Sequence, residues 1–589
     1  MQTMEKQENN DMSDELTRYK QGKETIPETQ WLLPLYGAGM ENLGSDGKLI
    51  QVPVPDYGPD ELLVRHDAVG LCFSDTKVIR QGENHPRIYR NMQANPVVLG
   101  HEVAMTVVGV GENLQDQVQV GDRFIIQADI YAGGVNLAYG YEIQGGLSQY
   151  NVMDQRILNG DDGSYLIPVQ PGTGYAESAL TEPWACVVAA YQLTYRTGIK
   201  GGGTTWIVGA GSDRPYTIEP DGNYTIGSGF DGASHPKRLL LTNVPAAFEE
   251  WLRERAAVLG IEVFEIDDVA APPEDLVDDI ILLGADADLI EALSPSLANF
   301  GIMAIVAEEP LARKVQVDVG RVHYNRWLYV GGRGPDIAAA YSDVPVRASL
   351  KPGGKALFVG AGGPMGRMHV QRALQVADGP STIVCTDVSS ERLRELRDTF
   401  AANARAKSIE FYSLNPLMMD FPLLMVEAKE EGFDDVIVLA PVASVISDSA
   451  ADLAPGGVMN VFAGVGRGTM AAIDLSGAYL EGKRVIGHSA STIDDLRLML
   501  AQAESGVLSP NRSVAAVGSL SAARDGLQAV QETAFPGKIV IYPNIRDFPL
   551  TALPDLKDSL PSVYAELEDG KVWTVEAEEE WLRRMLGGE

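Results

Sequence analysis

The stretch 355–392 constrains the fold more than any other part of the chain. It holds an apolar run (356–359), a glycine cluster, a helix-like segment and a second apolar run that ends at Asp387. Strand, glycine turn, helix, strand and terminal acid is the order of a dinucleotide-binding βαβ unit. Glycines let the backbone approach a pyrophosphate, whose charge is stabilised at a helix N-terminus. The stretch therefore predicts a parallel α/β sheet that binds a dinucleotide.

The residues expected to contact the dinucleotide are a continuous run and two later side chains: Gly360, Ala361, Gly362, Gly363, Pro364, Met365 and Gly366, then Asp387 and Arg392. The G-x-G-x-x-G spacing is met only if Ala361 stands in the first position. Asp387 follows at the usual distance of about 20 residues and can accept hydrogen bonds from the ribose hydroxyls of NAD. An acid there favours NAD over NADP, although Arg392 blurs the preference. The alternative is an ordinary glycine-rich connection in a parallel sheet.

Length, charge and cysteine content narrow the class of protein. A chain of 589 residues has room for about three or four domains. Its net charge of −34 argues against non-specific nucleic-acid binding, which depends on Lys and Arg. Three cysteines are too few for a disulfide framework, so a cytoplasmic location is expected. Residues 1–30 are polar, without the apolar core of a signal peptide, and we expect a disordered tail; no apolar run is long enough to span a membrane.

Residues 49–154, with Glu182 following them, supply a constellation of candidate metal ligands. Short apolar runs broken by Gly, Pro and Asp are typical of a small β-barrel. GLCFSD, GHE and LTEPWAC supply the candidates Cys72, Ser74, Asp75, His101, Glu102 and Glu182. Thiolate, imidazole and carboxylate are ligands of catalytic zinc, and Asp75 is placed to hold a histidine ring from behind. Singly, each has a structural alternative: a cysteine or histidine packs in the core, and Glu182 acts as an acid at a helix N-terminus.

Together these motifs resemble the zinc-dependent medium-chain dehydrogenase/reductase family, especially its polyol (sorbitol) dehydrogenase branch. The similarity rests on GLCFSD, GHE, VGDRF, GGLSQY, EPWAC and GAGGPMG with Asp387, in the family's order, over about residues 45–200 and 350–545. It implies a GroES-like barrel and a Rossmann domain. It also implies one catalytic zinc on Cys72, His101 and Glu182, with Glu102 as an exchangeable fourth ligand and Ser74 in a proton relay.

The sequence departs from many members of this family at a second zinc site. The four closely spaced cysteines of a structural zinc are absent, because no cysteine lies between Cys72 and Cys186. The string GPMGRMH is further similar to L-sorbose 1-phosphate reductases. If the substrate carries phosphate, Arg87 and Arg90 are candidates to bind it, since guanidinium groups match phosphate oxygens. The alternative is that both are solvated loop charges.

The middle of the chain repeats part of the nucleotide-binding pattern. DDIILLGADADLIEAL begins at Asp278 and DDVIVLAPVASVISDS at Asp434, and the two regions align without a gap at an offset of 156 residues (434 − 278). In the first copy, 212–236 are too rich in Gly, Pro, Asp and Tyr for the expected helix, and Asn243 takes the place of Asp387. We expect this copy to fold without binding NAD in the usual way. Two alternatives are binding of another nucleotide through 212–236 and an unrelated α/β insertion.

The expected fold class is α/β plus β: a GroES-like barrel with a duplicated Rossmann-type, doubly wound parallel sheet. The expected parts are a tail (1–30), the first part of the catalytic domain (31–200), a degenerate Rossmann copy (201–345), the NAD-binding copy (346–507), and a return to the catalytic domain with a C-terminal extension (508–589). The last strands of the two copies, 327–330 and 484–487, are expected to pair antiparallel within one chain and cover an exposed edge. The resemblance also allows a homo-oligomer.

The resemblance implies a zinc-dependent oxidoreductase that transfers a hydride between NAD(H) and a secondary alcohol or ketone. Its substrate would be a small polyol, sugar or sugar phosphate, with neither nucleic acid nor membrane as a partner. Two other classes stay open from the sequence. One is a zinc-independent reductase of activated double bonds on the same scaffold, and the other is a non-enzymatic nucleotide sensor.

Overall fold

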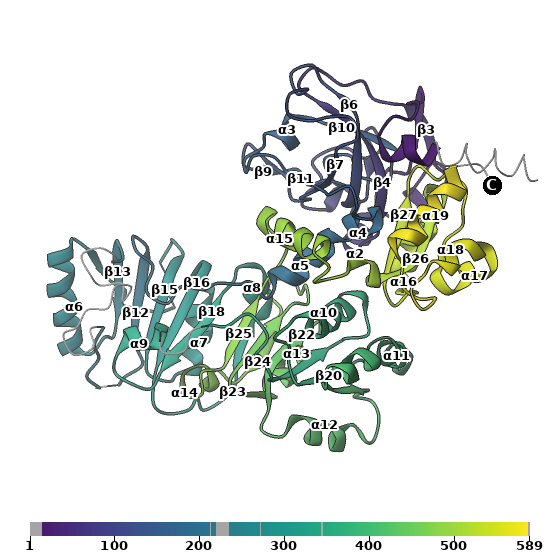
Figure 1. Ribbon diagram of the computed structural model, residues 1–589. Coiled ribbons are helices and arrows are strands. Elements are labelled where there is room, and N and C mark those ends of the chain that lie inside the picture. The colour runs from purple at the N-terminus through teal and green to yellow at the C-terminus, as the bar shows by residue number, and fades with distance from the viewer. Residues whose placement is uncertain (1–14, 213, 219–234, 271–272, 343–345, 587–589) are drawn as a thin grey trace, which may run out of the picture. The chain divides into compact units, whose positions relative to one another are not determined.

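The computed structural model describes residues 15–212, 214–218, 235–270, 273–342 and 346–586 (Figure 1). The chain divides into two compact units. The first runs to Val188 and resumes at Ser491, and the second is Ala189–Ala490. Among the described helices none has the length and apolarity needed to cross a membrane.

The first unit is built on an eight-stranded sheet in which distant parts of the chain meet. Its strand order is β11 (Leu166–Pro168), β7 (Arg123–Ile126), β6 (Glu102–Val110), β4 (Leu62–Gly70), β27 (Lys538–Tyr542), β26 (Val514–Ser519) and β28 (Thr551–Ala552), and β10 (Tyr150–Met153) also pairs with β4. β27 runs antiparallel to β4, so residues 538–542 belong to the same sheet as the strands from the first part of the chain. Three small pairs complete it: β1 (Thr29–Leu32) with β3 (Ile50–Pro53), β2 (Pro34–Leu35) with β5 (Val97–Val98), and β8 (Tyr131–Ala132) with β9 (Val135–Asn136).

Helices of the first unit lie on both sides of the central gap in its sequence. Before the gap are α2 (Phe73–Gln81), α3 (Gln155–Leu158), α4 (Tyr175–Ala179) and α5 (Thr181–Ala189), whose last residue opens the second unit. After it are α15 (Ile493–Glu504), α16 (Ala523–Glu532), α17 (Leu556–Ser559), α18 (Pro561–Ala565) and α19 (Val575–Leu586). Both the first part of the chain and the residues after 490 thus supply helices to this unit.

The second unit contains two six-stranded parallel sheets with the same strand order. The first is β14 (Glu262–Glu265), β13 (Arg238–Thr242), β12 (Thr204–Gly209), β15 (Val277–Leu283), β16 (Leu297–Val306), β18 (Leu328–Gly332). The second is β21 (Glu410–Leu414), β20 (Thr382–Thr386), β19 (Lys355–Val359), β22 (Phe433–Val438), β23 (Leu453–Val461), β25 (Arg484–Gly487). In each sheet the chain starts in the third strand, moves to one edge, then returns to build the other half, which is the order of a doubly wound fold.

Nine helices cover the two parallel sheets in the described part of this unit. Those of the first sheet are α6 (Ala246–Leu259), α7 (Ala287–Leu293), α8 (Val319–Tyr324) and α9 (Ile337–Ser342). Those of the second are α10 (Pro364–Gln375), α11 (Ser390–Ala406), α12 (Phe421–Lys429), α13 (Ala443–Ala450) and α14 (Ser476–Leu480).

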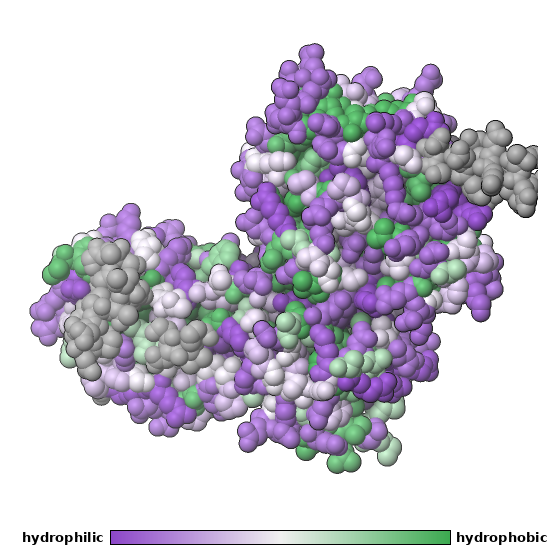
Figure 2. Space-filling model, viewed as in Figure 1, coloured by the Kyte–Doolittle hydropathy of each residue, from purple (hydrophilic) through white to green (hydrophobic). Residues whose placement is uncertain are grey.

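Figure 2 shows a largely hydrophilic surface, with apolar side chains exposed over α12, where Leu423 and Val426 are 74% and 69% exposed.

Two expectations about boundaries are wrong. Residues 15–20 are helical rather than a disordered tail, because Leu16 and Tyr19 are buried and the Tyr19 carbonyl accepts a hydrogen bond from Arg65. Because the first 30 residues are polar on average, these two apolar positions did not stand out in the sequence. Helix α15, assigned from the sequence to the second Rossmann copy, belongs to the first unit. Residues 1–14 and most of 212–236 lie outside the described residues.

The predicted antiparallel pairing of 327–330 with 484–487 is also wrong. β18 and β25 approach within 8 Å between Cα atoms, but each is the last strand of its own sheet. The hydrogen-bonded link between the two sheets is instead a separate antiparallel pair, β17 (Val315–Asp318) with β24 (Met470–Ile473). Glycines at the ends of β18 and β25 let helices α14 and α8 pack against them, and this contact takes the place of the expected ladder.

Candidate metal and nucleotide sites

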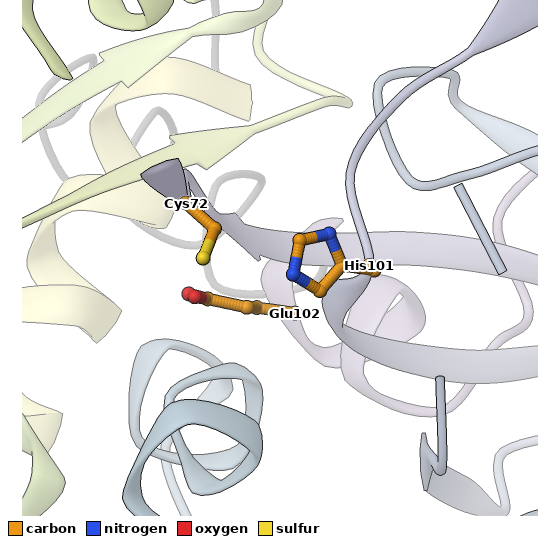
Figure 3. Close-up of side chains that lie close together, drawn as sticks. All are labelled: Cys72, His101 and Glu102. Atoms are coloured by element: carbon orange, nitrogen blue, oxygen red, sulfur yellow. The ribbon is translucent and has the colours of Figure 1, made fainter. Parts of the chain in front are cut away.

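Three potential metal ligands converge in the first unit. Cys72 is the N-cap of α2, His101 directly precedes β6, and Glu102 is the first residue of that strand. One ligand atom from each lies within 4.8 Å of the other two. Figure 3 shows the sulfur of Cys72 and the carboxylate of Glu102 facing each other beside the His101 ring. His101 and Glu102 are buried, so a charge held here is shielded from water.

The orientation of the His101 ring is set by two neighbours on α2. Its Nδ1 lies 3.1 Å from an Asp75 carboxylate oxygen and its Nε2 lies 3.1 Å from the Ser74 hydroxyl. Asp75 also accepts a hydrogen bond from the Cys72 backbone N–H at 3.0 Å. Burial opposes a charge on the ring, but the Asp75 carboxylate outweighs it and the pKa of His101 is raised well above 6.5. Asp75 thus occupies Nδ1 and leaves Nε2 on the side of Cys72.

The Glu102 carboxylate has one oxygen occupied and one without a partner. Lys538 Nζ, at the start of β27, donates to Glu102 Oε1 at 2.5 Å and to the Leu71 carbonyl at 2.7 Å. Glu102 Oε2 is buried and has no hydrogen-bond partner among the described residues. A Cβ on Gly70 would lie 2.1 Å from Oε2, so only glycine leaves room for it. An orphaned carboxylate oxygen beside a thiol and an imidazole fits a zinc ion, which such donors bind.

Glu182 lies outside this three-residue group. It is the second residue of α5, and no oxygen of it joins the set of atoms within 4.8 Å. Burial raises the pKa of Glu182 to about 7, with His101 lowering it and Glu102 raising it further. The Glu182 carboxylate therefore lies close enough to His101 and Glu102 to interact with them electrostatically, but it is not one of the three grouped ligands.

Two neighbours of the site were not found from the sequence. Lys538 is the only charged residue of β27, and a lysine that opens an otherwise apolar strand in GKIVIYP was an available signal. The Tyr141 ring lies 5.9 Å from the His101 ring and 5.3 Å from the His85 ring, between centroids. Burial raises the pKa of Tyr141, which keeps its hydroxyl protonated near neutral pH. No spacing in the sequence pointed to Tyr141.

The two phosphate candidates are already engaged by carboxylates. Arg87 forms an ion pair with Asp129, and Arg90 pairs with Glu142 at 3.1 Å. Arg87 also lies 5.9 Å from the centre of the Tyr141 ring, which places it near the cluster. A phosphate would have to share these guanidinium groups with their carboxylates.

The glycine turn of the second sheet has the local geometry of a dinucleotide site. Gly360 ends β19 with a φ of 83°, a conformation that favours glycine. Helix α10 starts at Pro364 with Gly363 as N-cap, and a Cβ on Gly363 would meet nothing within 4 Å. A Cβ on Gly366 would lie 2.6 Å from Ala361, so this glycine permits close packing of helix on strand. The open position therefore lies at the N-terminus of a twelve-residue helix, where a pyrophosphate is stabilised.

The two sheets differ at the residue that would bind the ribose. Asp387 follows β20 and accepts hydrogen bonds from the backbone N–H groups of Gly362 at 3.1 Å and Ser389 at 2.9 Å. Arg392, on α11, lies beside it: a Cβ on Gly362 would be 2.7 Å from the Arg392 Cβ. In the first sheet Asn243 is exposed and has a φ of 50°. The acid is thus fixed against the glycine turn in one sheet and replaced by an amide in the other.

Comparison with known proteins gives partial matches to dehydrogenases and a full-length match to a protein of no stated function. Residues 58–159 match the alcohol dehydrogenase GroES-like domain. Mannitol-1-phosphate 5-dehydrogenase of Aliivibrio fischeri is 29% identical over 49% of this chain and 72% of that protein. Sorbitol dehydrogenase of Bacillus subtilis is 32% identical over 28% of this chain and 46% of that protein. The uncharacterized protein YggP of Escherichia coli is 22% identical over 90% of this chain and 93% of its own length.

The cysteine–histidine–glutamate cluster lies in the part of the chain that matches the GroES-like domain, and the parallel sheets lie in the second unit. The chain therefore contains a domain of the alcohol dehydrogenase GroES-like kind and is similar in part to polyol and polyol-phosphate dehydrogenases. These similarities favour an oxidoreductase over a non-enzymatic nucleotide sensor.

Proposed function

We propose that this enzyme uses one catalytic zinc and NAD(H) to interconvert a secondary alcohol and the corresponding ketone on a polyol or sugar. The observation that carries the proposal is the unpartnered, buried Glu102 oxygen beside Cys72 and His101. An uncompensated buried carboxylate oxygen is costly, and a bound cation removes that cost. Cys72, His101 and Glu102 would hold the metal, and Glu182 is the further ligand that the family resemblance implies.

The side chains around the cluster have separate tasks in this chemistry. Zinc, when bound, lowers the pKa of an alcohol oxygen as it does that of water. Ser74, at 3.1 Å from His101 Nε2, is placed to receive the alcohol proton. Asp75 keeps the His101 ring in one orientation and tautomer. Lys538 holds one oxygen of Glu102 and so limits how far this carboxylate swings.

The coenzyme would bind the second parallel sheet. When bound, it supplies the hydride acceptor. The helix N-terminus at Gly363 would meet the pyrophosphate and Asp387 the ribose hydroxyls. Asp387 favours NAD because a carboxylate repels the 2′-phosphate of NADP, and the positive charge of the neighbouring Arg392 weakens this discrimination.

We further infer that the two sheets are copies of one Rossmann-type domain and that only the second binds the coenzyme. The same ion pairs support each sheet: Lys200 with Asp278 at 2.6 Å in one, and Lys351 with Asp434 at 2.6 Å in the other. In both copies the lysine backbone N–H also donates to the following aspartate, Asp279 or Asp435. Copies of one domain would preserve such a network where an unrelated insertion would not.

The direct test is a panel of polyols and sugars, each with and without a phosphate, assayed with NAD and with NADP at the nicotinamide absorbance. Zinc content is measured on the same sample. We expect about one zinc per chain, turnover with NAD, and loss of activity with a chelator. Turnover that persists in metal-free protein would support the zinc-independent reductase instead. Comparison of each polyol with its phosphate decides whether Arg87 and Arg90 contribute to recognition.

A further inference from the structure

The C-terminal helix places a buried carboxylate against the catalytic unit. Helix α19 is anchored by Trp581, which is fully buried and lies 4.6 Å from the Phe548 ring between centroids. On the same helix Glu578 is 3% exposed. Burial raises the pKa of Glu578, and several hydrogen bonds to its carboxylate oppose this shift. A carboxylate is costly to bury, so its partners show what it stabilises.

One set of partners is the start of helix α4. Glu578 Oε2 accepts a hydrogen bond from the Tyr175 backbone N–H at 2.5 Å, and Oε1 accepts one from the Ala176 N–H at 2.7 Å. The N-cap residue of α4, Gly174, has no side chain with which to cap. The first N–H groups of a helix need external acceptors. Glu578 therefore supplies the cap of α4 from a position about 400 residues later in the chain.

Helix α4 leads directly into the helix that carries Glu182. Leu180 is the C-cap of α4 and Thr181 is the first residue of α5, so no loop separates the two helices. The Thr181 hydroxyl donates to the Glu177 carbonyl at 3.1 Å, which ties the two helices together. Leu180 also packs beside the metal cluster, because a Cβ on Gly70 would lie 2.9 Å from Leu180 Cδ2 and 2.1 Å from Glu102 Oε2. The start of α4 is thus connected through α5 to Glu182 and through Leu180 to the packing around Glu102.

The second partner of Glu578 is strand β27. The Tyr542 hydroxyl donates to Glu578 Oε1 at 2.7 Å. Tyr542 and Lys538 are four positions apart on this strand and so lie on the same face. Lys538 is the residue that holds Glu102 Oε1. One carboxylate on the C-terminal helix is therefore connected to the helix pair that carries Glu182 and to the strand whose Lys538 holds Glu102.

We propose that Glu578 is a positioning residue for the metal site. Through α4 and α5 it sets the place of Glu182, and through Tyr542, β27 and Lys538 it sets the place of Glu102. This inference rests on the proposed zinc site, and it assigns residues 550–589 a role in metal geometry beyond closing the fold. Neighbours that orient metal ligands typically contribute about 10- to 100-fold to metal affinity or activity.

The test uses the full chain with Co²⁺ in place of zinc, because the ligand-field bands of Co²⁺ report coordination geometry. Glu578→Gln keeps the shape of the side chain but loses its charge and one acceptor oxygen. We expect the bands to shift and the affinity for Co²⁺ and Zn²⁺ to fall about 10-fold. Glu578→Asp, which restores the carboxylate, should recover part of the affinity. Tyr542→Phe cuts only the connection to β27 and should produce a smaller shift.

The matched control is Glu579→Gln, one position further along α19. Glu579 is partly exposed and its ion pair is with Lys20 at the surface. This variant should bind metal like the unchanged protein. The inference is overturned if Glu578→Gln lowers only the melting temperature while its metal affinity and Co²⁺ spectrum match those of Glu579→Gln. If the unchanged protein itself binds no metal, the proposed function fails, and the inference fails with it.

Discussion

At the residue scale, the cluster of Cys72, His101 and Glu102 depends on a position that carries no side chain. Gly70 ends β4 next to β6, and Glu102 Oε2 fills the space where a Cβ would stand. The conformation of Gly70 is ordinary, so the requirement is for room rather than for a left-handed backbone. Such a glycine is easily taken for a weak strand residue when only the sequence is considered.

Gly70→Ala should therefore weaken metal binding. Its Cβ would displace Glu102 Oε2 and also press on Leu180, so we expect a loss of about 10-fold or more in zinc affinity. Equilibrium dialysis against zinc measures this. Gly172→Ala is the control, because a Cβ there would meet nothing within 4 Å. Equal zinc affinity in the two variants would show that Glu102 does not bind the metal.

Glu177 gives the stability of the protein a defined pH dependence. Burial, followed by the nearby Glu578, raises the pKa of Glu177 to about 7 from 4.5. The folded state then keeps a proton that the unfolded chain releases, so stability falls as pH rises from about 4.5 through about 7. Glu177→Gln should raise the free energy of unfolding at pH 8 by about 2 kcal/mol. At pH 4 Glu177 is protonated in both the folded and the unfolded state, so denaturant titration should give the same free energy of unfolding for the variant and the unchanged protein. A more stable variant at pH 4 would show that the stabilisation has another cause.

At the element scale, the two parallel sheets meet through a symmetric set of contacts. A Cβ on Gly331 would lie 2.6 Å from the Tyr479 Cβ, and one on Gly487 would lie 2.8 Å from the His323 Cα. The pairs Gly331/Gly487 and His323/Tyr479 are each separated by the 156-residue offset of the repeat. Residue and partner thus exchange places between the two sheets, as across a two-fold axis.

Gly487→Ala should loosen this interface. The added methyl group would meet the backbone of α8 at 2.8–3.0 Å, and we expect a loss of about 1–3 kcal/mol in the free energy of unfolding. Gly466→Ala serves as the control, since a Cβ there has open space. Thermal unfolding of both variants measures the difference, and equal melting temperatures would mean that the contact between the copies adds no stability.

Contacts between residues that are close in the sequence could be predicted from it, whereas contacts between residues far apart in the sequence could not. The turn at Gly360, the helix after it and Asp387 are local, and pattern alone located them. Cys72 and Asp75 lie in one motif, and His101 follows Cys72 by 29 residues (101 − 72) in the next motif. Lys538 and Glu578 reach their partners across 436 and 403 residues, where no periodicity links them. Their contacts are a product of tertiary folding, and only the packed molecule shows them.

At the scale of the whole molecule, the chain contains two parallel sheets with the same strand order. The number of coenzyme molecules that one chain binds is therefore a property to be measured. Only the second sheet has an acid held against its glycine turn, whereas the first has Asn243 in that place. We therefore expect titration calorimetry of the full chain to give one NAD per chain. Asp387→Asn removes the charged acceptor and should weaken NAD binding about 10-fold, since a hydrogen bond to a charged group contributes about 1.5–3 kcal/mol.

The reciprocal change in the other copy completes this test. Asn243→Asp places an acid after β13 and leaves Asp387 unchanged, so on the proposal that only the second sheet binds the coenzyme, NAD affinity and stoichiometry should stay as they are in the unchanged protein. A stoichiometry of two, or a loss of NAD binding confined to Asn243 variants, would move the coenzyme to the first sheet. One NAD per chain, sensitive to Asp387 alone, would leave the first copy a structural partner for the second, held to it through the β17–β24 pair.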